Sequence, residues 1–375
     1  MDNELSLITS QINDELIIKF RDAVNDNHMF VFHKYSNREG KNQWNPICSC
    51  MDWISVAIRS IQSTPALSTD IDVKVMQVYS LISSIDIVNE SIVSLYSIFN
   101  AKKGRVSPFK GASNCFKNND MTCDDDSYFK EIRARFGAHP VNLDGENGEK
   151  LFASWPHDRF DSEYDIQVRL YSNVVGNDDK AFGIKISELL IFLDSRYSYL
   201  DVLIEEISNQ YSLYSKVKSA EPIPRTPEVL KQLDILDKGS ERRLDNDYYR
   251  STILDLKMIF GCNTGLVHLQ EQEALFKNSK KALLEEVLNN LQNMNLVDLV
   301  HCDTLSRKPP ERKLSYELPK LYSWIYSERY DPMLDYYMRR LNKISNEEYE
   351  FSENDGPERT FLKLKLFLYG FNDIE

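Results

Sequence analysis

The chain has 375 residues, of which 42% are hydrophobic and 27% are charged, and its formal net charge is −13. This length allows about two domains, each with its own hydrophobic core. The negative balance argues against indiscriminate binding of polyanions, so any nucleic-acid site has to be a local basic surface.

Six cysteines are sparse for this length and lack the spacing of a disulfide framework or of zinc-ligand pairs, which fits a reducing cytosol. A four-thiolate site from Cys48, Cys50, Cys115 and Cys123 is the less favoured alternative. The acidic start at Met1 does not resemble a secretory signal, and no apolar run approaches the ~20 residues of a spanning helix. We expect a cytoplasmic protein without metal, cofactor or membrane partner.

Helical spacing of apolar residues runs over 4–34 and 47–63, and it is strongest from Asp70 to Asn100. The last stretch is predicted to be a core helix. Asp86 and Glu90 lie four residues apart and share one face of it, where they could orient arginines or face solvent. We favour the solvent interpretation.

A loop-like segment, residues 101–119, carries five cations, two phenylalanines and no acidic residue. Cations interleaved with Phe109 and Phe116 suit phosphate contact and base stacking, and a solvated loop is the alternative. The candidate RNA-binding residues are Lys102, Lys103, Arg105, Lys110 and Lys117. The acidic run 124–126 that follows is predicted to cap the next helix rather than to bind a divalent metal.

The next helix carries Arg133 and Arg135 and leads to His139 and Pro140. Proline disfavours helical geometry in the residue before it, so His139 should lie at or just past the helix end. An imidazole can take the proton of an RNA 2′-hydroxyl or protonate the leaving oxygen, and a guanidinium can stabilise charge on phosphate. The alternative is a pair of solvated arginines followed by a capping histidine.

Arg133, five intervening residues and His139 resemble the Arg-x(4–6)-His motif of the HEPN superfamily of all-α domains. The resemblance implies a helical bundle over 1–219 and catalytic roles for Arg133 and His139. It also implies a metal-independent endoribonuclease of a toxin or phage-defence system that acts on RNA as a homodimer, with an antitoxin or regulatory protein as a candidate partner. Many members have a polar residue after the arginine, whereas this chain has Ala134.

Beyond Pro140, three short runs rich in β-branched and aromatic residues alternate with turn residues, at 151–155, 166–171 and 181–186. They predict a small antiparallel hairpin inserted in the bundle. His157 lies in this region and is expected to be an exposed turn residue. Helical spacing resumes over 187–218.

Three prolines in the segment 218–227 mark a domain boundary, and a second helical domain is predicted over 226–375. Its segments 296–302 and 314–318 flank a basic loop, 307–313, and together resemble the strands and wing of a winged-helix domain. A polar connection between helices is the interpretation that we favour for this region. Further helices are predicted over 247–260, 280–294, 319–344 and 357–369.

The sequence therefore predicts a mainly α protein with an HEPN-like bundle, a small β-hairpin insertion and a helical C-terminal domain. The expected function is RNA cleavage by Arg133 and His139. A non-catalytic helical module for protein interaction or regulation is the alternative, which Ala134 and the acidic charge favour. No nucleotide-binding, zinc-protease or serine-hydrolase signature occurs in the sequence.

Overall fold

The computed structural model describes residues 12–102, 104–117, 121, 123–138, 143–145, 148–155, 163–305, 314–327, 329 and 331–370. Lys103, His139, Pro140, His157 and the basic loop 307–313 lie outside the described residues. The chain forms two compact units, Met1–Tyr211 and Ser212–Glu375. Both are mainly helical, and the described strands all belong to the first unit.

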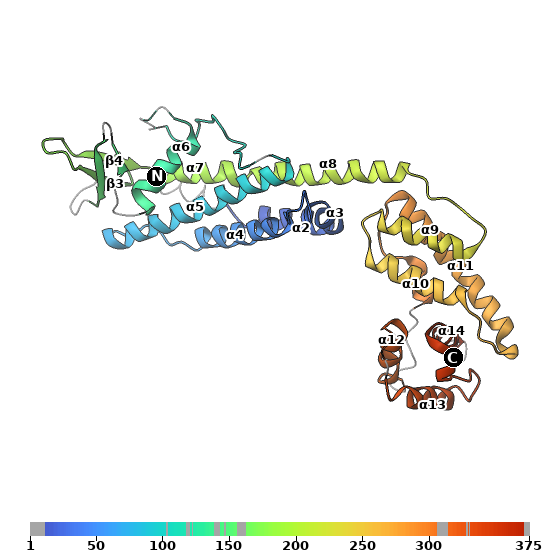
Figure 1. Ribbon diagram of the computed structural model, residues 1–375. Helices are drawn as coiled ribbons and strands as arrows, with labels where there is room; N and C mark the ends of the chain where they lie inside the picture. The colour runs from blue at the N-terminus through green and yellow to red at the C-terminus, as the bar shows by residue number, and fades with distance from the viewer. Residues whose placement is uncertain are drawn as a thin grey trace. The chain divides into compact units, whose positions relative to one another are not determined.

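The central helix of the N-terminal unit is α5 (Ile71–Phe99), which confirms the predicted core helix. It begins at Asp70, whose side chain accepts hydrogen bonds from the backbone N–H groups of Asp72 and Val73. Helix α4 (Trp44–Gln62) packs along it, and α2 (Glu15–Asp26) and α3 (His28–Tyr35) pack on α4 (Figure 1). The contact is built from buried apolar side chains that include Ile54, Ile58, Ile85, Val88 and Ile92.

By length and composition, helix α5 could also cross a membrane. The expectation that no apolar segment reaches this length is therefore wrong. However, 56% of its most apolar window is buried inside the N-terminal unit. Core helices have this arrangement because their apolar faces are covered by neighbouring helices.

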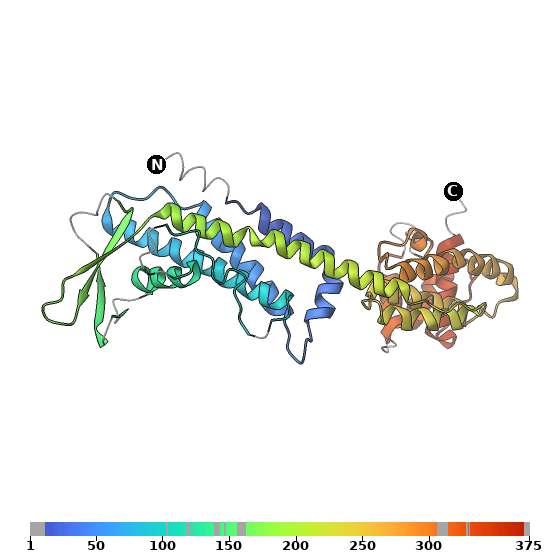
Figure 2. The same ribbon diagram turned by 90° about the horizontal axis from the view of Figure 1, so that it is seen from above.

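Helix α6 (Asp125–Arg133) continues into a π-helical turn, Ala134–Ala138, and an antiparallel sheet follows. The predicted hairpin strands are confirmed, with a further two-residue strand at the edge. The strands, in spatial order, are β1 (Leu143–Asp144), β2 (Lys150–Ser154), β3 (Ile166–Ser172) and β4 (Lys180–Ile184). Figures 1 and 2 both show the sheet at one end of the helices of this unit.

The helical pattern predicted over 187–218 forms two helices, α7 (Ile186–Tyr197) and α8 (Tyr199–Ala220). Helix α7 packs against α5. The division between the compact units falls within α8, before the proline-rich segment that marks the boundary in the sequence. That segment is not helical after Ala220, and Ile223 within it is buried in the core of the C-terminal unit.

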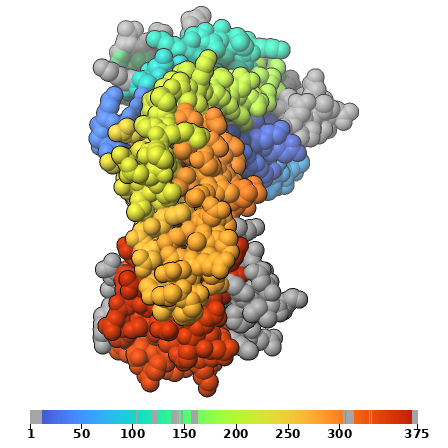
Figure 3. Space-filling model, turned by 90° about the vertical axis from the view of Figure 1, so that its right-hand side faces the viewer, coloured from blue at the N-terminus to red at the C-terminus, as the bar shows by residue number. Residues whose placement is uncertain are grey.

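The C-terminal unit contains α9 (Val229–Glu241), α10 (Asp247–Gly261), α11 (Gln270–Asn293), α12 (Glu317–Ser327), α13 (Leu334–Ile344) and α14 (Gly356–Gly370). Helix α14 packs on α10, α11 and α12, and its residues Phe361 to Leu368 are all buried. In Figure 3 the orange and red parts of this unit form one continuous surface. A helix buried on every side is expected at the centre of such a core.

Strands of a winged-helix type are not formed in the described part of this unit. Val300–Thr304 is a 3₁₀ helix whose first N–H groups, of Val300 and His301, donate to the Glu286 carboxylate at 2.6 and 2.9 Å. The second expected strand, 314–318, runs into α12, with Leu314 and Leu318 buried in the helical core. The interpretation of two strands flanking a wing is therefore wrong for these segments, because their leucines pack among helices.

Candidate functional site

The helix that carries Arg133 is anchored by the acidic run before it. Asp124 accepts the backbone N–H of Ser127 at 2.9 Å and that of Gly111 at 3.1 Å. A hydrogen bond from the Ser127 hydroxyl, followed by these two backbone hydrogen bonds, lowers the pKa of the Asp124 carboxyl. The prediction that this run caps α6 is thus confirmed for Asp124, and the same side chain ties the basic segment to the helix.

The other two aspartates of the run point to different partners. Asp125 is buried, and its carboxylate accepts the backbone N–H groups of Asn114 and Cys115 at 2.9 and 3.2 Å. Asp126 instead binds Arg196 of α7, with 2.7 Å between Oδ1 and Nη2. Because the carboxylates diverge, they do not form a set of metal ligands. Within the described residues, no group of three or more histidine, cysteine or acidic side chains is placed to hold a metal ion.

Arg196 connects α7 to the basic segment, a role that the sequence analysis missed. The residue is only 1% exposed, and its guanidinium lies 3.7 Å from the ring centre of Phe192 and 4.4 Å from that of Phe109. No motif surrounds this arginine in the sequence, so only the fold reveals that it is buried. Beside it, burial raises the pKa of the Cys115 thiol to about 11.

The two phenylalanines of the basic segment serve this packing. Phe116 is buried between Tyr128 and Phe192, and Phe109 packs on Tyr199 as well as on Arg196. The expectation that both rings stack on bases is therefore wrong for Phe116, because its ring is inaccessible. The described cations of the segment stay at the surface, and they are Lys102, Arg105, Lys110 and Lys117.

Arg133 lies in the last turn of α6 and forms an ion pair with Asp86 of α5, with 2.7 Å between Nη1 and Oδ1. One helical turn further along α5, Glu90 pairs with Arg105 of the basic segment. The Asp86 and Glu90 side chains are 21% and 41% exposed, so they are partly open to solvent, as expected, but each also forms an ion pair. Because residues four apart lie on one face of a helix, the two carboxylates lie side by side, and each binds an arginine.

Arg135 packs on the sheet and takes no part in the ion pair of Arg133. Its guanidinium lies 4.2 Å from the ring centre of Phe182 in β4 and 3.1 Å from the Glu131 carboxylate. The neighbouring Phe136 packs on Phe182 and on Trp155. These contacts fix the π-helical turn against the inner face of the sheet.

The π-helical turn ends at Ala138, directly before His139. Single π turns within α-helices are frequent at functional sites, since the extra residue redirects the side chains that follow. The structure describes Arg133 and the helix end, whereas the position of the His139 side chain lies outside the described residues.

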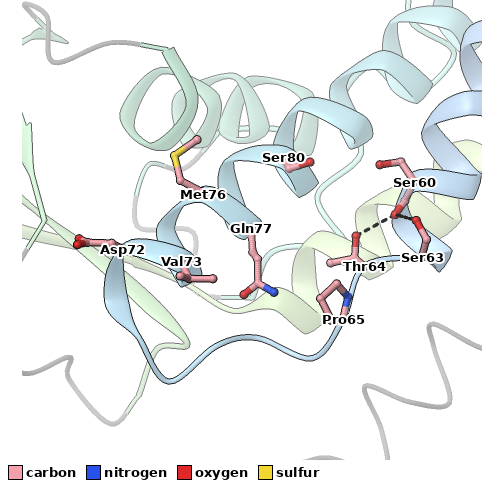
Figure 4. A pocket seen from close by; sticks show the side chains of 9 residues that line it. All are labelled: Ser60, Ser63, Thr64, Pro65, Asp72, Val73, Met76, Gln77 and Ser80. Carbon is pink, nitrogen blue, oxygen red and sulfur yellow. Dashed lines mark hydrogen bonds between the residues drawn. The ribbon is translucent and has the colours of Figure 1, made fainter.

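A pocket of about 730 Å³ lies apart from these residues, where α4 ends and α5 begins (Figure 4). Its lining consists of Ser60, Ser63, Thr64, Pro65, Asp72, Val73, Met76, Gln77 and Ser80. The hydroxyls of Ser63 and Thr64 donate to the backbone carbonyl of Ser60, so they close the end of α4. With Asp72 as its one ionisable side chain, this lining offers no acid–base pair.

Comparison of the chain with models of protein families, with curated proteins and with solved structures yields no match.

Proposed function

We propose that the protein is a metal-independent endoribonuclease of a toxin or phage-defence system, with an HEPN-like N-terminal unit and the catalytic pair Arg133 and His139. The observation that carries the proposal is the placement of Arg133. Its side chain is 46% exposed at the end of α6, next to the π-helical turn that leads to His139.

The proposed chemistry uses the RNA as its own nucleophile. The His139 imidazole takes the proton of the 2′-hydroxyl or protonates the leaving oxygen, and the Arg133 guanidinium stabilises the charge that develops on the phosphate. Because one histidine cannot be acid and base at once, the active species is a homodimer that joins two motifs. It acts in the cytosol and is restrained by an antitoxin or another regulatory protein.

The basic segment supplies the phosphate contacts around this site. Arg105 lies close to Arg133 because their partners, Glu90 and Asp86, are one turn apart on α5, a spacing of about 5–6 Å between Cβ atoms. Two guanidiniums so placed can bind two phosphates of one strand. The remaining cations of the segment, Lys102, Lys103, Lys110 and Lys117, extend this footprint.

The catalytic proposal is tested by RNA cleavage in EDTA. His139→Ala and Arg133→Ala should each abolish cleavage, because each removes a group that acts on the transition state rather than core volume. Lys130→Ala, an exposed cation on the same helix, is the matched control and should cleave like the wild type. Cleavage that persists in both of the first two variants would contradict the assignment.

A non-catalytic interaction module is the second candidate function. It is favoured by the ion pair that already occupies Arg133 and by the exposed apolar side chains Trp53, Val56 and Met76 on α4 and α5. Such a module would bind a protein partner and leave RNA intact. Absence of cleavage and of RNA binding, together with a stable protein complex that Trp53→Ala disrupts, would support it.

A further inference from the structure

The sheet of the N-terminal unit has two faces of opposite character. Val168, Leu170 and Phe182 lie on the inner face, and there Phe182 packs on Tyr128, Phe136 and Arg135. Side chains alternate between faces along a strand, so the neighbouring residues belong to the outer face. On this outer face, Phe152, Arg169 and Tyr171 are exposed.

Exposed aromatic side chains occupy the outer face. Phe152 of β2 and Tyr171 of β3 are direct cross-strand partners and are 37% and 41% exposed. In an antiparallel pair such residues stand side by side, with Cβ atoms about 4.5–5.5 Å apart. Two adjacent rings are therefore presented to solvent on a rigid backbone.

A third ring lies at the other end of the same face. A Cβ atom on Gly183 would overlap the Tyr164 ring, so this ring lies flat over Gly183 of β4. Gly183 pairs with Gln167, which places both on the outer face beside Arg169. The absence of a side chain at position 183 is thus what seats the aromatic ring on the sheet.

The charge of this face is positive. Lys150 and Arg169 share it with the aromatic residues, since they lie two residues before Phe152 and Tyr171 respectively. Asp144 of β1, the cross-strand partner of Lys150, is the one acidic position on this face of the described strands, so the cations outnumber it two to one. Exposed rings and cations on one face suit a strand that offers both bases and phosphates.

We propose that the outer face of this sheet binds single-stranded RNA, with Phe152 and Tyr171 stacking on successive bases and Lys150 and Arg169 contacting the phosphates. Exposed aromatic rings on a rigid sheet accept any base, because every base has a π-face, and nearby cations follow the backbone. A duplex keeps its bases stacked inside and cannot use the rings. The inference rests on the proposed function and names its substrate class.

The sheet is coupled to the catalytic motif through its inner face. Phe182 contacts Arg135, two residues after Arg133, and Phe136 in the π-helical turn. A strand bound on the outer face is therefore held on the same rigid element that positions the end of α6. An RNA strand that is bound there is held at one end and extends toward Arg133.

The test measures binding of the full-length protein to a labelled 12-nucleotide single-stranded RNA that contains 2-aminopurine, and to a duplex of the same sequence. Phe152→Ala and Tyr171→Ala should each weaken single-strand binding at least about fivefold and should suppress the change in 2-aminopurine fluorescence. Duplex binding should be weak in the wild type and unchanged in these variants. Tyr79→Ala removes an aromatic ring of 42% exposure from α5 and should bind like the wild type.

Three further variants keep the test decisive if the alanine variants misfold. Phe152→Leu and Tyr171→Leu retain apolar volume but remove the ring, so they should show the same loss, whereas Tyr171→Phe should retain binding. Wild-type affinity in all ring variants, while glutamate at positions 102, 103 and 105 abolishes binding, would overturn this inference and leave the proposed function standing. Failure of the wild type to bind any RNA would overturn both, and loss of a protein complex in the ring variants would identify the face as a protein-binding surface.

Discussion

Arg133 is accessible to a ligand and is also already paired with a carboxylate. Its guanidinium is 46% exposed and can reach a ligand, but Asp86 already neutralises it at 2.7 Å. An exposed ion pair of this kind contributes only about 0–1 kcal/mol to stability, so a phosphate can displace the carboxylate at little cost. The same holds for Arg105 and Glu90. Under the proposed function, each of these carboxylates on α5 competes with the phosphates of RNA.

Removal of these competitors should strengthen RNA binding. Asp86→Asn and Glu90→Gln should each raise the affinity for single-stranded RNA, because an arginine is freed without loss of shape. A plot of log affinity against log salt should steepen by about 0.7 for each freed arginine. Asp72→Asn is the matched control, because Asp72 is also on α5 but lies about 21 Å along the helix from Asp86. Weaker binding in the first two variants would show that the acids position the arginines rather than mask them.

At the scale of elements, the acidic run before α6 stabilises the loop and the helix together. Asp124 joins Gly111 to the first turn of α6, and Asp125 and Asp126 bind other parts of the same segment. The segment that carries the candidate phosphate-binding cations is thus held by three carboxylates. Its charges are presented from an ordered support, although its sequence reads as a solvated loop.

This support should depend on pH. The hydrogen bonds to Asp124 lower its pKa in the folded state, so its charged form stabilises the fold above the unfolded pKa of about 4. This stabilisation is lost as the pH falls through the lower, folded pKa. Asp124→Asn keeps a capping oxygen but removes the charge, so it should reduce the free energy of unfolding by about 0.3–1 kcal/mol at pH 7 and by less near pH 3. Urea titrations at both pH values measure this difference, and an equal deficit at both would contradict the role of charge.

The elements that the sequence predicts well are those whose signal is local. The apolar repeat of α5 and the β-branched and aromatic runs of β2, β3 and β4 are written in consecutive residues. The winged-helix interpretation fails because buried leucines at 296–318 fit a helical core as well as a strand. In such short runs, hydrophobic periodicity does not distinguish a strand from a helical segment.

For the candidate site, the sequence supplies the residues but not their partners. Arg133 is found from its spacing to His139, whereas its ion pair joins positions 47 residues apart. Arg196 has no signal at all, because its partners Phe109 and Asp126 lie far from it in the sequence. The exposed pair Phe152 and Tyr171 follows from strand register, which the turn lengths between the strands do not specify.

At the scale of the whole molecule, a net charge of −13 has to be reconciled with the proposed RNA substrate. Long-range repulsion lowers the rate of encounter, so binding depends on short-range contacts at a local surface. In the N-terminal unit, the described cations of the basic segment and the outer face of the sheet are the surfaces proposed to make such contacts. RNA affinity should accordingly rise steeply as salt is lowered.

If the active site is composite, an inactive protomer should inactivate the wild-type protomer with which it forms a mixed dimer. If each active site needs the motifs of two chains, an equal mixture of wild type and His139→Ala, allowed to exchange subunits, forms wild-type dimers for only about a quarter of its molecules. RNA cleavage should then fall to about a quarter of that of undiluted wild type at the same total protein concentration, rather than to about half. Sedimentation across micromolar concentrations establishes that both proteins dimerise. Activity at half, or a strict monomer that still cleaves RNA, would show that each chain carries a complete site.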